Sequence, residues 1–252
     1  FKQKTAYEIP KRDWSSDVAL PIWTKLFILC NPQNPTGRVF TREELTRMGN
    51  LCIKHHVTVI ADEIHQDVVY SGHKHIPFAS ICPEFAEITV SFMNPSKTFN
   101  VPGFRTAAFI ASNPVLKSAV HEMLVNNKAI GENICGTIAF YTAYEQCDYY
   151  ADQLVAYLEK NRDLVEQTLK DVPGIEVTHA EGTYLLWLDC RGLGFESQKA
   201  LDKWLVEIAK LGFNSGMSFG PEGEGYARMN IAAPRSTVEE ALHRLTNAVK
   251  AL

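Results

Sequence analysis

The sequence has no long hydrophobic run and no marked excess of charge of one sign. None of its apolar stretches approaches the ~20 residues of a membrane-spanning helix, and no signal-peptide pattern opens the chain. Its 25 lysines and arginines oppose 29 aspartates and glutamates, with no basic run. Nucleic acids and anionic membranes bind concentrated positive charge. We therefore expect neither of these partners, and predict a protein that acts on a small molecule.

Paired cysteines, repeats and low-complexity segments are also missing. The six cysteines stand far apart, and none has the Cys-x-x-Cys spacing of a zinc ribbon or a redox motif. This usage favours reduced thiols and a cytoplasmic protein. With 252 residues, 46% of them apolar, the chain is long enough for one large or two modest domains with real cores.

The first 22 residues are treated apart from the rest. Their sequence, FKQKTAYEIPKRDWSSDVALPI, resembles a translated sequencing adapter more than a protein segment. We expect residues 1–22 to be a non-native leader that takes no part in the fold. A genuine polar leader is the alternative, and on either interpretation the segment carries no chemistry.

Apolar runs alternate with a helical pattern in the first half of the chain. KLFILC predicts a strand buried on both faces, and the turn-forming NPQNPTG follows it. Thr41 and Glu44 form a capping box for a helix that reaches His55. Three more runs predict strands: VTVIADE, ITVSF and TAAFIAS. This order predicts an α/β layer with a largely parallel sheet, and function at its strand ends.

The second half reads as helices followed by a smaller α+β unit. Helices are predicted in PVLKSAVHEMLVNNK, over 136–150 and over 151–170, the last amphipathic and bridging two domains. Strands are expected at IEVTH, YLLWLDC and YARMNIA, a helix over 198–211, and a last helix capped by Thr237 and Glu240. The glycine-dense NSGMSFGPEGEGYA predicts a mobile edge of a site. We expect part of a large domain over 23–136 and an interdomain helix with a small domain over 137–252.

Four residues with side chains suited to catalysis or binding follow one another in an order that is typical of one enzyme family. They are Asn34 in NPQNPTG, Asp62 in ADEIH, Lys97 in SFMNPSKTFN and Arg228 in YARMNIAAPR. Any one of them alone is more often a cap or a surface residue. Together, over 25–252, they resemble the class I and II aminotransferases, which are fold type I enzymes dependent on pyridoxal 5′-phosphate (PLP). The resemblance implies an α/β fold with an incomplete, mostly parallel large domain and a smaller α+β carboxy-terminal domain.

The resemblance also implies a role for each residue. Lys97 would form the Schiff base with PLP and then serve as general base for the substrate α-proton. Asp62 would keep the pyridine nitrogen protonated. Asn34 would hydrogen-bond the ring's 3-hydroxyl. Arg228 would bind the α-carboxylate of an amino acid substrate through its fork of N–H donors.

Phosphate contacts are implied at two further positions. Ser96 and Arg105 match the family's phosphate-binding serine and arginine. For Arg105 the alternative is a buried pair with a carboxylate, and Arg235 is expected to pair at the surface or to cap a helix. Asn94 stands where many relatives carry another phosphate-binding serine.

One departure from the transaminase pattern is informative. His65 occupies the position where many transaminases carry a tyrosine that contacts the ring. We count it among the cofactor-binding residues, and packing beside the ring is the alternative. DEIHQDVVYSGHKHIPFASI and SKTFNVPGF resemble the cystathionine β-lyase-like, or carbon–sulfur β-lyase, branch. The resemblance implies release of a thiol, pyruvate and ammonia from cystathionine or a cysteine conjugate. An aminotransferase and a PLP-fold regulatory binding protein are the alternatives.

A metal site is the rival interpretation of the histidines. His65, His73 and His75 stand near acidic residues, but their spacing matches no standard zinc pattern, so no metal is expected. Four aromatic residues are assigned to the core of the small domain, with Phe219 a possible wall of a substrate pocket: Tyr184, Trp187, Phe213 and Phe219.

The resemblance carries one expectation about the whole protein. The family's amino-terminal segment supplies a phosphate-binding turn and an aromatic that stacks on the ring, and neither is recognisable before Asn34. We therefore expect this chain alone to fold poorly or to bind PLP weakly, and the full-length protein to be a cytoplasmic homodimer.

Overall fold

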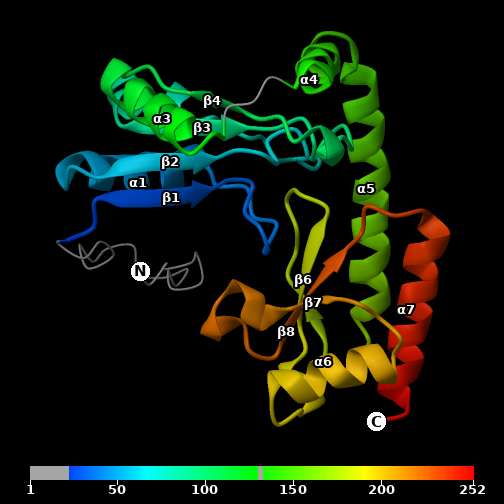
Figure 1. The fold of residues 1–252 in the computed structure, drawn as a ribbon. Helices are drawn as coiled ribbons and strands as arrows, with labels where there is room; N and C mark the ends of the chain where they lie inside the picture. The colour runs from blue at the N-terminus through cyan, green and yellow to red at the C-terminus, as the bar shows by residue number, and fades with distance from the viewer. Residues whose placement is uncertain (1–22, 130–132) are drawn as a thin grey trace.

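The computed structural model describes residues 23–129 and 133–252 (Figure 1). The expected leader, residues 1–22, lies outside the described residues. The helices are α1 (Arg42–Lys54), α2 (Pro83–Glu87), α3 (Pro114–Asn126), α4 (Ile134–Gln146), α5 (Asp148–Leu169), α6 (Gln198–Glu207) and α7 (Arg235–Lys250). The strands are β1 (Leu26–Cys30), β2 (Thr58–Asp62), β3 (Thr89–Met93), β4 (Ala108–Ile110), β5 (Glu176–Val177), β6 (Leu185–Asp189), β7 (Asn214–Ser215) and β8 (Tyr226–Asn230). Short 3₁₀ helices η3 to η7 lie between them, η3 at Phe78–Ser80, η4 at Pro102–Phe104 and η5 at Arg191–Leu193.

The first sheet confirms the predicted, largely parallel α/β layer. Its order is β1-β2-β3-β4, with β1, β2 and β3 parallel and β4 antiparallel to β3. The register sets Cys30 beside Asp62 and Asp62 beside Phe92. The carboxyl ends of the parallel strands therefore meet at one edge, where the predicted site residues follow them.

Strand β1 departs from the expectation that it is buried on both faces. It is an edge strand, and Leu26 and Ile28 are 48% and 47% exposed, whereas Leu29 is buried. The apolar run is the same in either environment, so its composition alone did not reveal which face is covered. Leu29 points to the core formed with Leu45 of α1 and Phe85 of α2.

The second sheet is antiparallel, in the order β5-β6-β8-β7, and packs against α5, α6 and α7. Leu186 and Leu188 of β6 enter a core shared with Leu158 of α5. Val68 and Tyr70, which follow β2, belong to this core as well, so the loop after β2 reaches the second sheet. Figure 1 shows α5 running alongside both sheets.

The helix termini test the capping predictions. Thr41 and Glu44 form the predicted capping box of α1, with the N–H of Glu44 donating to Thr41 Oγ1 over 3.2 Å. For α7 the predicted cap at Thr237 and Glu240 is wrong. The helix begins at Arg235 because Pro234 has a φ of −52° and its carbonyl accepts the N–H of Thr237, which places Thr237 inside the first turn.

The predicted end of the helix that begins at Gln198 also changes. Helix α6 ends at Glu207 instead of Leu211, because the chain turns at Lys210, whose φ is +57°, and the N–H of Leu211 donates back to the carbonyl of Leu205. The glycine-dense segment contains β7 and two 3₁₀ turns, η6 (Gly216–Phe219) and η7 (Pro221–Gly223). Gly216 and Gly223 approach so closely that a Cβ on Gly216 would lie 2.0 Å from the carbonyl oxygen of Gly223.

In residues 23–129 and 133–252, no helix is both long enough and apolar enough to cross a membrane. All six cysteines are free thiols.

Gly37 joins the turn after β1 to the loop before β6. Its carbonyl accepts the N–H groups of Glu181 and Gly182, both over 2.9 Å. Its φ is +73°, and an added Cβ would lie 2.6 Å from Cβ of Ala180. Backbone conformation and close contact therefore both require glycine here.

We expect Gly37→Ala to lower the free energy of unfolding by about 3 kcal/mol, because it adds a steric clash to the cost of a left-handed alanine. Denaturant unfolding measures the change. Gly72 is the matched control: its φ is +86° but nothing lies within 4 Å of its added Cβ. Gly72→Ala should cost only about 1 kcal/mol. Equal losses in the two variants would show that the Gly37 contact contributes nothing.

Candidate functional site

Asn34 is carried by a tightly bonded turn after β1. The N–H of Gly37 donates to the carbonyl of Gln33 over 2.7 Å, and the side chain of Gln33 accepts the N–H of Thr36 over 2.8 Å. The N–H of Asn34 donates to Sγ of Cys30, at the end of the strand, over 3.5 Å. The turn therefore holds the Asn34 side chain in a fixed place at the strand ends.

Arg228 approaches this turn from the second sheet. It lies on β8, and its two terminal nitrogens donate to Oδ1 of Asn34 and Oδ1 of Asn214, each over 2.9 Å. Its guanidinium carbon sits 4.9 Å from the ring centre of Phe219. The buried Nε has no hydrogen-bond partner among the described residues. Burial lowers the pKa of Arg228, and the nearby Tyr184 opposes this.

Asp62 is the last residue of β2 and is partly buried at the same edge. Its Oδ1 accepts the N–H of Ile64 over 3.3 Å. Burial raises the pKa of its carboxyl group, while that hydrogen bond and the charge of Lys97 lower it. The charge of Lys97 therefore acts on the Asp62 carboxyl group across the strand ends.

Lys97 lies in the loop after β3, which its neighbours hold in place. The buried Ser96 donates its hydroxyl to the carbonyl of Val101 over 3.3 Å, and its N–H donates to Oδ1 of Asn94 over 2.7 Å. On the other side, the hydroxyl of Thr98 donates to Oδ2 of Asp67 over 2.8 Å. These bonds tie the lysine-bearing loop to the loop that follows β2.

His65 is buried between the two sheets, with 2% of its surface exposed. Its ring meets Tyr184 edge-on, with ring centres 5.4 Å apart, and its Nδ1 has no hydrogen-bond partner among the described residues. Burial, with smaller contributions from the charges of Lys97 and Arg228, lowers the pKa of His65 to about 4. The imidazole is therefore neutral near pH 7.

The low pKa of His65 predicts a pH-dependent cost of folding. Between its folded pKa of about 4 and its ordinary value of 6.5, the unfolded chain binds a proton that the folded chain does not. Its contribution to stability therefore falls as the pH drops below 6.5. In His65→Phe, we expect the free energy of unfolding to rise relative to the parent by about 2 kcal/mol between pH 8 and pH 5.

Denaturant unfolding without added cofactor at the two pH values measures this effect. The exposed His121 on α3 gives the control, since His121→Phe should change the two free energies equally. A parent-to-variant difference that is the same at pH 8 and pH 5 would contradict the neutral, buried state of His65.

The two residues predicted to bind phosphate, Ser96 and Arg105, lie in different surroundings. Ser96 lies beside Lys97, but its hydroxyl is engaged with the backbone as described above. Arg105 is exposed at the end of η4 with a φ of +48°. Its backbone N–H donates to the carbonyl of Pro102 over 3.1 Å, and no ion pair joins its side chain to the described acidic residues. The alternative of a buried carboxylate pair for Arg105 is therefore wrong. The structure brings together Asn34, Asp62, His65, Lys97 and Arg228 and leaves Arg105 outside their contacts.

Several supporting residues were not identified from the sequence. Asn214 holds Arg228, Tyr184 packs on His65, and Asp67 anchors the Lys97 loop and also accepts the hydroxyl of Tyr144 over 3.3 Å. Asn214 opens the glycine-dense segment, which was the one signal in its favour. The aromatic expectation is confirmed for Trp187, which is buried.

The histidines considered for a metal site lie in different surroundings. His73 approaches Glu181 at 3.9 Å, and His75 approaches Glu63 at 3.7 Å, while His65 faces Tyr184. In the described part of the chain, no group of three or more histidine, cysteine, aspartate or glutamate side chains is arranged to hold a metal ion.

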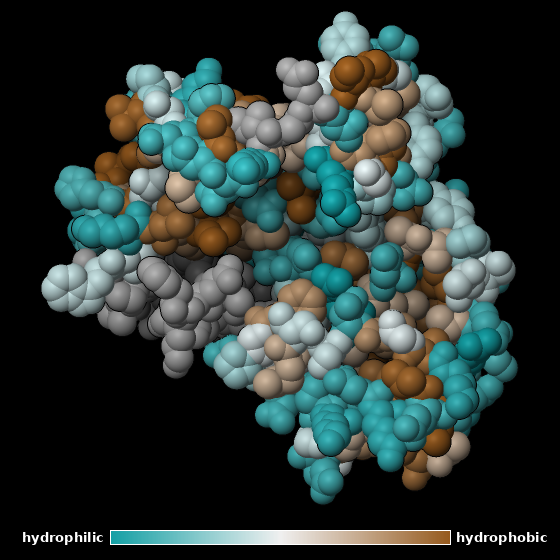
Figure 2. Space-filling view, viewed as in Figure 1, coloured by the Kyte–Doolittle hydropathy of each residue, from teal (hydrophilic) through white to brown (hydrophobic). Residues whose placement is uncertain are grey.

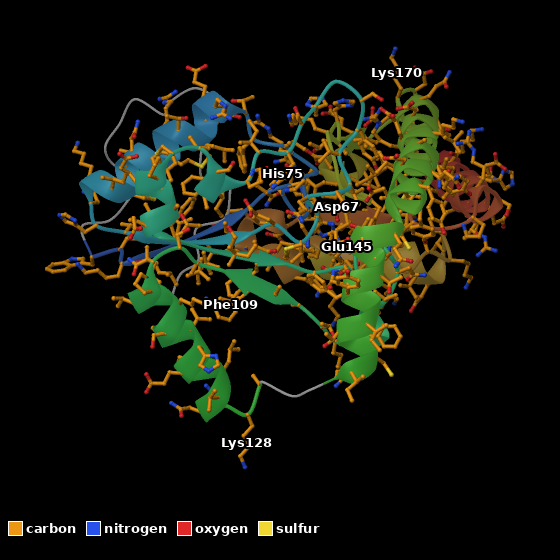
Figure 3. The ribbon with its side chains drawn as sticks, turned by 90° about the horizontal axis from the view of Figure 1, so that it is seen from above. Asp67, His75, Phe109, Lys128, Glu145 and Lys170 are labelled. Atoms are coloured by element: carbon orange, nitrogen blue, oxygen red, sulfur yellow. The ribbon has the colours of Figure 1, made fainter. Side chains whose placement is uncertain are left out.

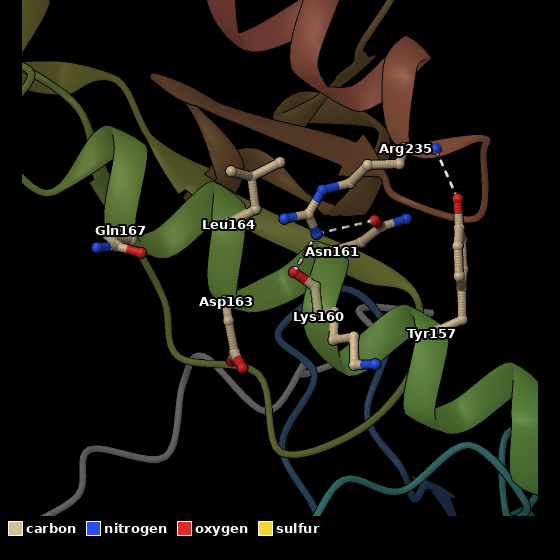
Figure 4. Close-up of a pocket in the computed structure, with 7 residues that line it drawn as sticks. All are labelled: Tyr157, Lys160, Asn161, Asp163, Leu164, Gln167 and Arg235. Carbon is tan, nitrogen blue, oxygen red and sulfur yellow. Dashed lines mark hydrogen bonds between the residues drawn. The ribbon is translucent and has the colours of Figure 1, made fainter.

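A cavity of about 500 Å³ lies elsewhere, along α5 and the start of α7 (Figure 4). Arg235 donates to the carbonyl of Lys160 over 2.7 Å, its N–H donates to the hydroxyl of Tyr157 over 2.6 Å, and its Nε pairs with Glu239 at 3.3 Å. The expectation of a surface pair for Arg235 is therefore confirmed. The residues that line the cavity include none of the five site residues.

A lysine loop at the ends of parallel strands, faced by an aspartate and met by an arginine from a second sheet, defines an α/β protein of the fold type I transferase class. The chain belongs to the aminotransferase class I and II family, whose model matches residues 11–245. It is 37% identical to the cystathionine beta-lyase PatB of Bacillus subtilis over 97% of this chain and 63% of that protein.

Solved structures give the same result. Cystalysin of Treponema denticola, whose crystal structure contains PLP, superposes with a TM-score of 0.87 at 32% identity, over 90% of this chain and 58% of that one. A PLP-bound putative aminotransferase of Clostridium difficile 630 gives a TM-score of 0.85 at 41% identity, over 89% and 58%. The chain thus spans about three fifths of the length of these relatives.

Proposed function

We propose that the protein binds PLP and is a carbon–sulfur β-lyase that acts on cystathionine or related cysteine S-conjugates. The observation that carries this proposal is the convergence of Lys97, Asp62 and the Asn34–Arg228 pair at the strand ends, beside the buried His65. The similarity to a cystathionine beta-lyase over nearly the whole chain supports the choice of reaction.

The unused polar groups of the site fit PLP. His65 Nδ1 and Arg228 Nε are buried without partners among the described residues, and the Asp62 carboxylate accepts a single hydrogen bond there. Unpaired buried groups cost free energy unless a ligand satisfies them. Asp62 suits a protonated pyridine nitrogen, Asn34 an aromatic hydroxyl, and Lys97 an aldehyde. When bound, PLP supplies an electron sink for the carbanion formed at the substrate α-carbon.

The chain's own residues then bind, orient and move a proton. Arg228 has five N–H donors and uses two of them on Asn34 and Asn214. The remaining donors can bind the carboxylate of an amino acid. Lys97 Nζ takes the α-proton, and Asp62 holds a negative charge where the ring nitrogen is to stay protonated.

The proposed reaction is a β-elimination followed by hydrolysis. The C–H bond at the α-carbon breaks with its proton going to Lys97, and the electron pair expels the thiolate from the β-carbon. The thiolate takes up a proton and leaves as the thiol. The released 2-aminoacrylate reacts with one water to give pyruvate and ammonia, so no oxidant or reductant is needed.

Transamination is the alternative, because the same residues serve it. The similarity to a putative aminotransferase is the observation in its favour. The stretches DEIHQDVVYSGHKHIPFASI and SKTFNVPGF, which resemble the lyase branch, favour elimination.

A homodimer in the cytoplasm completes the proposal. Figure 2 shows apolar side chains on the surface over α4, and Ile134, Ile138 and Tyr141 of this helix are 69%, 60% and 63% exposed. A second copy of the chain would remove such a patch from water. Six free cysteines favour a reducing compartment.

The product assay tests the proposed reaction. The full-length protein is incubated with PLP and L-cystathionine, and pyruvate is measured beside amino-group transfer to a keto acid. We expect pyruvate without transfer. Transfer without pyruvate would contradict the lyase and leave an aminotransferase that uses the same Lys97.

A further inference from the structure

A row of three polar side chains with little exposed surface lies next to the candidate site. It consists of Asn31, His75 and Glu63. Asn31 follows β1, Glu63 follows β2, and His75 lies on the segment before η3. Asn31 and Glu63 are 1% and 4% exposed, and the His75 side chain is 8% exposed. Seen from above, His75 lies toward the middle of the molecule, whereas Lys170 lies at its periphery (Figure 3).

The hydrogen bonds of Asn31 determine which atoms donate and which accept along this row. The N–H of Phe40 donates to Asn31 Oδ1 over 3.0 Å, so the Asn31 amide nitrogen is the group that faces His75 Nδ1, 3.4 Å away. An amide N–H can only donate, and Nδ1 must therefore accept. The imidazole proton then resides on Nε2, which points at Glu63 Oε1 over 3.7 Å.

Glu63, at the other end of the row, accepts hydrogen bonds. Glu63 Oε1 accepts the N–H of Phe78 over 2.8 Å. Burial raises the pKa of Glu63, while the hydrogen bond from Phe78 opposes this, and burial lowers the pKa of His75 to about 4. His75 is thus neutral near pH 7 and presents its Nε2–H to Glu63. At 3.7 Å this contact is an electrostatic one, longer than a hydrogen bond.

Such a row is less stabilising than apolar packing, because buried polar side chains contribute less to the free energy of folding than apolar side chains of the same volume. Its place in the fold gives it a use. Asn31 starts the turn that bears Asn34, and its N–H donates to the carbonyl of Asp62 over 3.0 Å. Glu63 is the residue after Asp62. The two end residues of the row, Asn31 and Glu63, are therefore both joined through the backbone to Asp62, and Asn31 also begins the turn of Asn34.

We propose that Asn31, His75 and Glu63 are a positioning unit, with His75 as its centre, that sets Asn34 and Asp62 at the spacing PLP requires. The inference rests on the proposed function, since it concerns the cofactor of the same site. His75 is a positioning residue: among the described residues it contacts Asn31 and Glu63, and no contact joins it to Lys97 or Arg228.

Substitution of His75 separates positioning from simple packing. His75→Leu removes both polar contacts, whereas His75→Asn keeps a polar atom at the place of Nδ1 and so can accept from Asn31. The PLP dissociation constant, kcat and KM are measured, together with the pH at which the visible band of the bound cofactor titrates. Denaturant unfolding of the cofactor-free variants is measured in parallel.

In His75→Leu we expect PLP to bind about tenfold more weakly, kcat/KM to fall by about 10- to 100-fold mainly through kcat, and the band to titrate at a different pH. His75→Asn should recover most of the PLP affinity. His121→Leu, at an exposed position on α3, should match the parent in every readout.

A His75→Leu protein that loses stability but binds PLP with the parent's affinity and band titration would overturn the inference. If that variant does not fold, Asn31→Ala decides: PLP binding about tenfold weaker than the parent's supports the inference, and parental affinity contradicts it. All variants are made in the full-length protein, and failure of that parent to bind PLP would instead refute the proposed function, and with it the inference.

Discussion

Replacing Lys97 with alanine is expected to abolish turnover and to remove the covalent link between protein and cofactor. Lys97 is the described lysine whose charge acts on both Asp62 and His65. Its amine has two proposed roles, attachment of PLP and removal of the α-proton, and loss of a residue with such a double role should lower kcat by at least about 10⁴-fold. Steady-state kinetics and the visible spectrum measure the two losses.

Lys128→Ala is the matched control, since Lys128 follows α3 at the periphery of the molecule (Figure 3). It should leave both readouts at the parent's level. A Lys97→Ala protein that keeps its turnover would refute the assignment of Lys97. One that loses turnover but keeps the full biological effect of the protein would support the regulatory, non-enzymatic alternative.

Replacing Asp62 with asparagine is expected to lower kcat by about 10²- to 10³-fold. The amide has nearly the same shape and can still accept the N–H of Ile64, so the fold should persist. What it loses is the negative charge. An opposite charge within about 4–6 Å shifts the pKa of a titratable group by about 1–3 units in favour of its charged form, and each unit is worth ~1.36 kcal/mol. Protonation of the ring nitrogen is expected to depend on this charge.

The measurement compares kcat and the PLP dissociation constant of Asp62→Asn with those of Asp152→Asn, a substitution at an exposed position on α5. The second variant should behave as the parent. If Asp62→Asn turned over at the parent's rate, Asp62 would not be the residue that keeps the ring protonated.

Much of the fold could be predicted because its signals are local. The capping box at Thr41 and Glu44 and the apolar runs of β2 and β3 depend on residues close in sequence. Exposure of Leu26 and Ile28 could not be predicted, because it depends on which elements cover β1 and not on the strand itself. The start of α7 was misplaced because Pro234 initiates the helix before Thr237 can cap it.

The candidate site likewise has residues that could be predicted from the sequence and residues that could not. Asn34, Asp62, Lys97 and Arg228 were found through the resemblance of their motifs to a family. The contact between Asn34 and Arg228 joins residues 194 positions apart, and no local pattern predicts it. Asn214 was missed, and His75 was considered only for a metal site, for the same reason: their partners are supplied by the tertiary fold. Sequence patterns thus identified the residues proposed to carry the chemistry but not those that contact and position them.

Trapping the cofactor on the chain tests the central claim most directly. The full-length protein is incubated with PLP, reduced with borohydride and digested, and the peptides are mapped by mass spectrometry. The account predicts one modified lysine, Lys97, in the peptide that contains SFMNPSKTFN. Modification of another lysine, or of none, would contradict it.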